Sequence, residues 1–246
     1  MNQGPKEGEA MDIHKPKPIR NFREFLKEVG IIVLGVCIAL GAEQTVEWVH
    51  WQSEVRAARS ALQAEIAANN ENMFAFRIAT ASCLDQQIAE ADGIITALEA
   101  GREPGKFTHL RYTASNLTRD SEWQSERASQ VLTHFPRAEL AMMGRYYAQV
   151  ETLRDWTAME ASAWLELTIL QNPPAGITTS DLIRLRINLG IVQRTEYLTI
   201  LNSKRQLALS RQLGIADPAP DPVRVNNFCT MNTADYQRYR ATQDLR

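Results

Sequence analysis

Several features that mark common functional classes are scarce or absent in this chain of 246 residues. The formal net charge is only -2 and no basic stripe occurs, so nothing in the composition suggests nucleic acid as a partner. No glycine-rich phosphate loop and no Gly-x-Ser-x-Gly elbow is present, and the four histidines are scattered. We therefore expect a protein that is not an enzyme and that holds no cofactor and no metal ion.

Proline and glycine are both missing between Glu43 and Asp92, and the chain has no internal repeats at solenoid periods. The hydrophobic share of 44% and the charged share of 23% are those of a folded protein rather than a disordered one. About 200 residues follow the amino-terminal region, which is enough for one domain with a sizeable core.

One apolar run stands out in this otherwise polar sequence. Val29–Ala42 is fourteen residues without a polar side chain, so it is apolar on every side of a helix and must be buried in lipid or protein. Fourteen residues cover only about 21 Å, but with its apolar flanks the segment from Phe25 to Trp48 reaches about 36 Å, enough to cross a bilayer. We predict a transmembrane anchor over residues 23–51, in contact with the lipid bilayer.

The flanks of this anchor predict its orientation. Basic residues precede the run, and none follows it before Arg56. Because positive residues stay in the cytoplasm, we expect a polar cytoplasmic tail at 1–22 and a periplasmic carboxyl-terminal domain, in the inner membrane of a bacterium. Lys27, Trp48 and Trp51 are the predicted membrane-interface residues. A buried helix of a cytosolic domain and a cleaved signal peptide remain alternatives.

The three cysteines divide according to this topology. Cys37 lies inside the predicted anchor, which leaves Cys83 and Cys229 together on the outer side. In an oxidising compartment these two are a possible disulfide. Two independent buried thiols are the alternative, because the sequence alone does not show how closely the two Cα atoms approach.

The remainder of the chain has the pattern of long helices. Apolar residues recur every eleven positions at Leu62, Met73, Leu84 and Ile95, which predicts a nearly straight rod that continues from the anchor and ends near Gly101. Arg77 and the pair Asn69–Asn70 interrupt this stripe, and we expect them to snorkel towards water or to face it.

Three further helices are expected after a loop over residues 106–120. The first runs from Asp120 or Ser121 through His134, and the second has Pro136 at its first position and ends at Asn172. The third begins at the cap sequence Thr178–Asp181 and ends at Leu213 before Gly214.

Residues 183–191 alternate between apolar and polar, which is also typical of a strand, but no partner strand is evident and we favour helix. The tail over 217–246 is expected to be irregular and to return to the body near Cys229. The predicted fold is therefore all-α: one amino-terminal transmembrane helix continues into a bundle of about four long helices, with a bundle domain at 52–216.

Two groups of side chains are candidate sites. Tyr146, Tyr147 and Trp156, with Arg145 as a charged neighbour, form a possible ligand pocket between helices, although the same aromatics are common in bundle cores. Glu47 and His50 have the Glu-x-x-His spacing of di-iron bundles, but the further carboxylates that such a centre needs are missing, which favours an ordinary interfacial pair.

The segment from Arg23 to Gln44, followed by Val46-Glu47-Trp48, resembles the amino-terminal signature of uncharacterised bacterial single-pass membrane-anchored proteins. A basic, aromatic lead-in precedes a Gly-Val-x-Ile-Ala-Leu core, a polar pair and a tryptophan. The resemblance implies a single-pass protein with a helical outer domain and no assigned activity, and it carries over no functional residues.

Two functions fit these features. The first is a membrane-anchored periplasmic interaction or scaffold protein, with a protein partner or with self-association. The alternative is a periplasmic helical bundle that senses or binds a small molecule.

Overall fold

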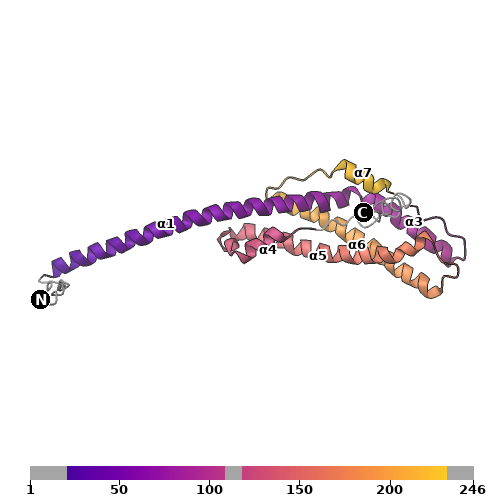
Figure 1. The fold of residues 1–246 in the computed structure, drawn as a ribbon, viewed down its shortest axis with the longest axis horizontal. Coiled ribbons are helices and arrows are strands. Elements are labelled where there is room, and N and C mark those ends of the chain that lie inside the picture. Colours follow the sequence, from indigo (N-terminus) through magenta and orange to yellow (C-terminus); the bar gives the residue numbers. More distant parts are fainter. Residues whose placement is uncertain (1–20, 109–117, 232–246) are drawn as a thin grey trace, which may run out of the picture. The chain divides into compact units, whose positions relative to one another are not determined.

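The structure is a computed structural model that describes residues 21–108 and 118–231. Most of the predicted cytoplasmic tail, the middle of the predicted loop and the end of the predicted tail lie outside these residues. Within the described residues the chain is helical and contains no strand, and a long apolar amino-terminal helix is followed by a helical bundle (Figure 1). This confirms the predicted all-α fold.

The helices follow one another along the chain, and three of the short ones are not α-helices. Their bounds are α1 Phe22–Asn69, the π-helix η1 Asn70–Ala75, α2 Phe76–Ala79, α3 Ala81–Glu99, α4 Ser121–Ala128, the 3₁₀ helix η2 Val131–His134, α5 Arg137–Leu167, the 3₁₀ helix η3 Thr168–Gln171, α6 Thr179–Gln212 and α7 Pro222–Thr230.

The chain divides into two compact units, Met1–Gln52 and Ser53–Arg246. In the first unit the side chains of α1 are exposed, including Lys27 and Trp48, and only Trp51 is half-buried. The apolar 18-residue window of this helix has 0% of its residues buried in protein, and the helix is long and apolar enough to cross a membrane. By length and composition, the prediction of one membrane-length helix near the amino terminus is confirmed.

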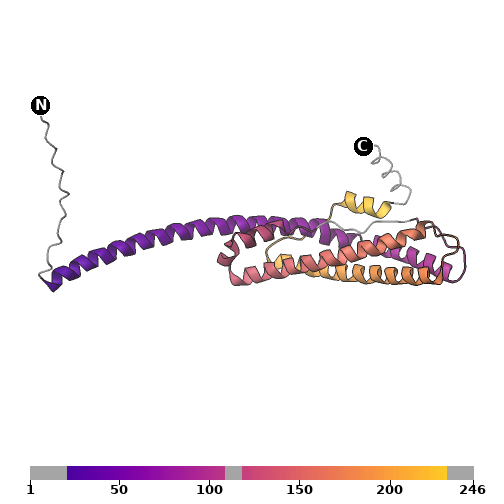
Figure 2. The ribbon, with the colours of Figure 1, turned by 60° about the horizontal axis from the view of Figure 1, so that its bottom comes forward.

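The second unit is built around α6. This helix lies beside α5 along much of its length and also packs against η1, α2 and α3 (Figure 2). One part of the core joins α3, α5 and α6 through fully buried aliphatic side chains, among them Ile95, Leu167 and Val192. The part of the rod that belongs to this unit, from residue 53 onward, forms one side of a bundle that α5 and α6 complete.

Local capping signals locate the start and end of α6. The Thr178 hydroxyl accepts a hydrogen bond from the Asp181 backbone N–H, and the Asp181 carboxylate accepts from the Thr178 backbone N–H. Gly214, with φ of 77°, follows the last turn in the left-handed conformation that glycine adopts at low cost. The predicted cap and end are confirmed, and residues 183–191 are helix.

The predicted helix from Asp120 or Ser121 through His134 is wrong in its extent. α4 ends at Ala128, and Gln130 has φ of 66°, which an α-helix cannot accommodate. The chain then forms the separate 3₁₀ turn η2. Pro136 is the cap of α5 rather than its first residue, because its ψ of 131° is extended.

The predicted irregular tail contains a helix. α7 begins after Asp221, whose side chain accepts a hydrogen bond from the Val223 backbone N–H. The Phe228 ring packs edge-on against Phe76 with ring centroids 5.7 Å apart. Residues near Cys229 do return to the body, as predicted, since Cys83 and Cys229 form a disulfide with Cα atoms 5.4 Å apart.

The rod is not the uniform helix that its eleven-residue pattern predicts. It passes through the π-helix η1 and is interrupted at Thr80, whose φ of -95° and ψ of 2° leave the helical range. Five successive residues, Met73 to Arg77, are buried, which a one-sided apolar stripe does not allow. α6 covers one side of this segment, and α7 contacts it through Phe76.

Candidate functional site

The two tyrosines of the predicted pocket belong to the core. Tyr146 and Tyr147 are 0% and 4% exposed. The Tyr146 hydroxyl lies 3.1 Å from Asn70 Oδ1, and the Tyr147 hydroxyl donates to Glu65 Oε1 at 2.8 Å. Burial, reinforced by this hydrogen bond to Glu65, raises the pKa of Tyr147 far above its usual value. Both hydroxyls therefore already have protein partners.

The other two members of the predicted pocket lie elsewhere on α5. Arg145 is exposed and Trp156 is half-buried, and Trp156 is about 13 Å further along the helix axis than Tyr147. The aromatic residue that does join Tyr147 is Trp123, which stacks on it with ring centroids 4.7 Å apart. The structure does not bring Arg145 and Trp156 together with the tyrosines.

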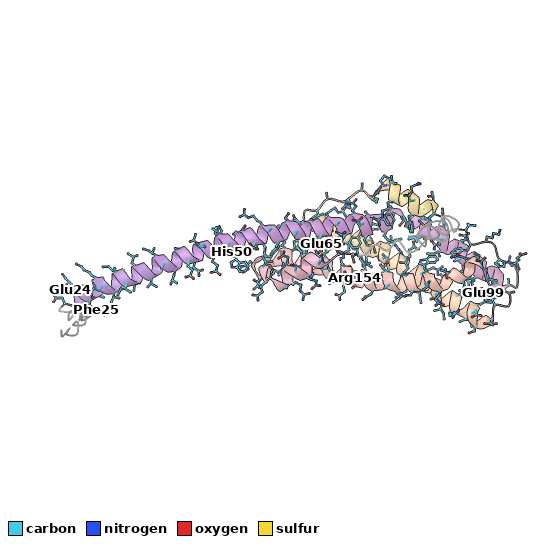
Figure 3. The ribbon with its side chains drawn as sticks, viewed as in Figure 1. Glu24, Phe25, His50, Glu65, Glu99 and Arg154 are labelled. Carbon is cyan, nitrogen blue, oxygen red and sulfur yellow. A yellow bond between two sulfur atoms is a disulfide. The ribbon has the colours of Figure 1, made fainter. Side chains whose placement is uncertain are left out.

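Glu65 lies on α1, where Figure 3 labels it, and its carboxylate is buried. Its Oε2 accepts hydrogen bonds from the Ser121 hydroxyl at 3.0 Å and from the Glu122 backbone N–H at 2.9 Å. These groups are at the amino terminus of α4, where a negative charge is favourable. The predicted cap residue Asp120 makes no side-chain cap bond, so a residue of α1 caps α4 instead.

A buried ion pair lies at the centre of the bundle. Arg77 and Glu160 both have 0% of their side chains exposed, and Arg77 Nη2 donates to both carboxylate oxygens at 2.7 Å. The expectation that Arg77 snorkels towards water is wrong, because α5 supplies a carboxylate for it inside the bundle. The expectation for Asn69 and Asn70 is wrong as well, since they are 2% and 0% exposed.

Internal partners replace water for both ends of the Asn69 amide and for the amide oxygen of Asn70, while Asn70 Nδ2 has no partner among the described residues. Asn69 binds the Arg119 backbone through both ends of its amide, with each contact at 2.7 Å. Asn70 Oδ1 lies 3.1 Å from the Ser210 hydroxyl. The π-helix begins at Asn70, and π-helical turns recur at functional sites in proteins.

Glu196 of α6 is a third buried carboxylate, after Glu65 and Glu160, and sequence reasoning missed it. Glu196 is 4% exposed, and its Oε1 has no hydrogen-bond partner among residues 21–108 and 118–231. Burial raises the pKa of Glu196 to about 7, against the opposing effect of Arg77, while Asp85 and Glu160 raise it further. Glu196 is therefore a carboxyl group that exchanges its proton near neutral pH.

Glu196 also lines a groove between α3 and α6, called here the α3–α6 groove. Its volume is about 500 Å³, which is within the range of small-molecule sites. The lining residues are Asp85, Ile88, Gln193, Glu196, Tyr197, Ile200, Leu201 and Lys204. The lining is mainly apolar in character, with carboxylates from both helices and one lysine.

Two hydroxyl groups on α6 extend the polar character of Glu196 into the core. Thr199 and Ser203 are both 0% exposed, and their hydroxyl oxygens have no hydrogen-bond partner in the described part of the chain. A sequence signal for this polar face existed. Polar residues recur at steps of three and four along α6, which places them on one side of the helix: Thr195, Thr199, Asn202, Gln206 and Ser210.

A second groove, of about 470 Å³, lies at the start of α6 and includes Ile183 and Ile187. Its charged residue Arg186 is already engaged, donating to Glu99 at 2.7 Å and 2.8 Å, to Thr96 at 2.7 Å, and to Asp92. The Arg186 guanidinium holds the pKa of Glu99 below its ordinary value. These contacts tie α6 to α3 and leave the groove mainly apolar.

Among residues 21–108 and 118–231, no three His, Cys, Asp or Glu side chains gather in a way that could hold a metal ion. Glu47 and His50 lie on the exposed part of α1. Cys37 is a free, exposed thiol.

Comparison with known proteins adds no assignment. No protein family, no curated protein and no solved structure matches this chain. The resemblance of the amino-terminal segment to bacterial membrane-anchored proteins stays a prediction.

Proposed function

We propose that this chain is a membrane-anchored helical bundle that binds a small molecule in the α3–α6 groove, with the bundle on the periplasmic side of a bacterial inner membrane. The observation that carries the proposal is Glu196, a buried carboxyl group with an unpartnered oxygen that lines a groove of about 500 Å³. Such a group costs stability unless something binds it, and shifted carboxyl groups in clefts mark functional sites.

Three features support the location. The exposed apolar part of α1 has the length and composition of a membrane helix. Basic residues precede it and are missing after it as far as Arg56, as in helices with a cytoplasmic amino terminus. The disulfide between Cys83 and Cys229 belongs to an oxidising compartment such as the periplasm.

A ligand screen tests the binding function. The full chain is inserted into lipid nanodiscs, and its melting temperature is measured with representatives of each metabolite class. A true ligand raises the melting temperature by mass action, and Ile200→Trp, which fills the groove, abolishes that rise. Leu165→Trp is the matched control, because Leu165 of α5 is 67% exposed. A screen in which no metabolite class raises the melting temperature contradicts the proposal.

A protein-interaction or scaffold function is the second candidate, favoured by one observation. Ile183 and Ile187 lie one helical turn apart on α6, and each is 58% exposed. Crosslinking of the full chain in native membranes is expected to give a larger species that is lost in Ile183→Asp/Ile187→Asp. That species should persist in Val223→Asp, which changes an apolar residue of α7 that is 65% exposed. Recovery of monomer alone counts against this function.

A further inference from the structure

The charges around the α3–α6 groove do not balance one another. Arg77 is compensated by Glu160, since one of its nitrogens contacts both oxygens of that carboxylate at 2.7 Å. Glu196 has an unpartnered oxygen, and Asp85 faces the same groove from α3. Among the described residues of the lining, Lys204 is the one cation. Within this part of the chain neither Asp85 nor Glu196 forms a salt bridge, although Arg77 lies near enough to Glu196 to lower its pKa.

The geometry separates these carboxyl groups from Lys204. α3 and α6 run antiparallel, because Arg186 near the start of α6 bonds Glu99 at the end of α3. Glu196 and Lys204 are eight positions apart on α6, which corresponds to about 12 Å along the helix axis. Asp85 and Glu196 thus make one end of the groove acidic, and Lys204 lies at the other end.

The walls between these ends suit the body of an organic ligand. Ile88, Ile200 and Leu201 supply aliphatic surface. The Tyr197 ring, whose residue is 66% exposed, lies beside Glu196 on the same groove. The face of an aromatic ring attracts a cation within about 6 Å, so this side chain adds to the preference for positive charge at the acidic end.

We infer that the α3–α6 groove takes an organic monocation, an ammonium group on an apolar body of a few carbon atoms, with the ammonium between Asp85 and Glu196. This inference rests on the proposed function and names its ligand class. The ammonium pairs with the carboxyl groups of Asp85 and Glu196, and the apolar body covers Ile88 and Leu201. Lys204 repels a second positive end, which disfavours diamines.

Binding of the cation is coupled to a proton. Glu196 faces Arg77 of α2, Asp85 of α3 and Glu160 of α5, and Lys204 lies on its own helix. Its pKa of about 7 leaves it partly protonated without ligand, and an ammonium favours the charged form. Affinity for an ammonium that stays protonated over this range is therefore expected to fall by about 30-fold between pH 8.5 and pH 5.5, which are on either side of that value.

Three probes of similar shape test the inference: 2-phenylethylammonium, neutral 2-phenylethanol and 3-phenylpropanoate. Each is titrated calorimetrically into the full chain in nanodiscs, with empty nanodiscs as the blank. The expected result is that the ammonium binds at least 10-fold more tightly than the other two. Equal or tighter binding of the alcohol or the carboxylate overturns the cation inference but leaves a binding groove. No heat from any probe overturns the inference, whereas the proposed function is contradicted only if the metabolite screen also gives no ligand.

Substitutions locate the binding. Glu196→Gln keeps the shape of the side chain and is expected to weaken 2-phenylethylammonium binding at pH 8.5 by at least 10-fold and to remove its pH dependence. Asp85→Asn, on an exposed residue whose change does not endanger folding, is expected to weaken binding several-fold. Glu151→Gln makes the same change of net charge on an exposed position of α5 and is expected to have no effect. Unchanged affinity in both groove variants overturns the inference.

Discussion

The buried ion pair between Arg77 and Glu160 makes two residues dependent on one another. With both side chains 0% exposed, each charge has lost its water, and only the partner compensates that loss. Burial nevertheless raises the pKa of Glu160, against the lowering effect of Arg77. A chain with two well-packed apolar residues in place of this ion pair would be about as stable. The ion pair therefore adds little net stability, but removing one of its partners is costly.

Breaking this pair on one side is expected to destabilise the bundle strongly. Arg77→Met lowers the free energy of unfolding by about 3–5 kcal/mol, because Glu160 is left buried without a partner. The double variant Arg77→Met/Glu160→Leu recovers most of that loss. Urea denaturation followed by tryptophan fluorescence measures both. Arg184→Met, which removes an exposed pair with Glu166 at 3.7 Å, is the control and costs less than about 1 kcal/mol. An equally small loss for Arg77→Met contradicts the prediction.

Glu196 predicts a pH dependence of stability. Its pKa is raised to about 7 in the folded chain, so between its unfolded value and pH 7 the folded state binds the proton more tightly. Stability from this group is present at low pH and is lost as the pH rises towards 7. The free energy of unfolding of Glu196→Gln minus that of the native chain should therefore be about 2–3 kcal/mol larger at pH 8 than at pH 5. Denaturant titrations at both pH values measure it, and a difference that does not change with pH refutes the prediction.

At the residue scale, the sequence predicts those interactions that a residue makes with its near neighbours in the chain. The Thr178 cap of α6 is readable because Thr178 and Asp181 are three positions apart and need no other element. The burial of Arg77 is not readable in that way, because its partner Glu160 is 83 positions away on α5. The α3–α6 groove was not predicted for the same reason, since Asp85 and Glu196 line one groove only after α3 and α6 have packed together.

Among the elements, α7 depends most on a covalent link. It has nine residues and none of them is buried, and a helix of that length is marginal in water without tertiary support. Its attachments include the disulfide at Cys229 and the Phe228 ring on Phe76. The Arg224 guanidinium also lies 4.3 Å from the Phe76 ring centroid and donates a hydrogen bond to Asn72 Oδ1 at 3.0 Å. The disulfide is the strongest of these.

Removing the disulfide is expected to loosen α7 without unfolding the bundle. In Cys229→Ser, amide hydrogen exchange over α7 rises by at least about 10-fold, because local opening no longer works against a covalent closure. Exchange over α5 should stay as in the native chain. Cys37→Ser is the matched control, since Cys37 is a free, exposed thiol. Unchanged protection of α7 in Cys229→Ser shows that the side-chain contacts suffice.

For the element scale in general, helix existence was easier to predict than helix detail. The apolar spacing along the rod predicted helix correctly, but it did not predict the π-helix at Asn70 or the interruption at Thr80. α4 was predicted too long, because its break at Gln130 depends on a left-handed residue without a glycine to announce it. α7 was missed because three prolines in this stretch favoured an irregular chain, although Pro222 is well suited to the first turn of a helix.

At the scale of the whole molecule, the membrane orientation can be tested directly. An alkaline phosphatase fused after Arg246 is expected to be active in a bacterial host, because the enzyme requires the periplasm and the charge pattern around α1 directs the carboxyl terminus there. The same fusion placed after Arg23, before the apolar run, is expected to be inactive. If the second fusion is active and the first is inactive, the orientation is opposite to the one predicted. The bundle would then lie in the reducing cytoplasm, where the disulfide is not expected.

The disulfide of α7 also affects what a protease can do. Cys83 and Cys229 are 146 positions apart, so most of α3 and all of α4, α5 and α6 lie within one covalent ring. A single backbone cut anywhere in that ring opens it but releases no fragment, and both pieces stay joined to the helix that begins at Phe22. Shedding the bundle from that helix by cleavage inside the ring would require a second event, reduction of the bond.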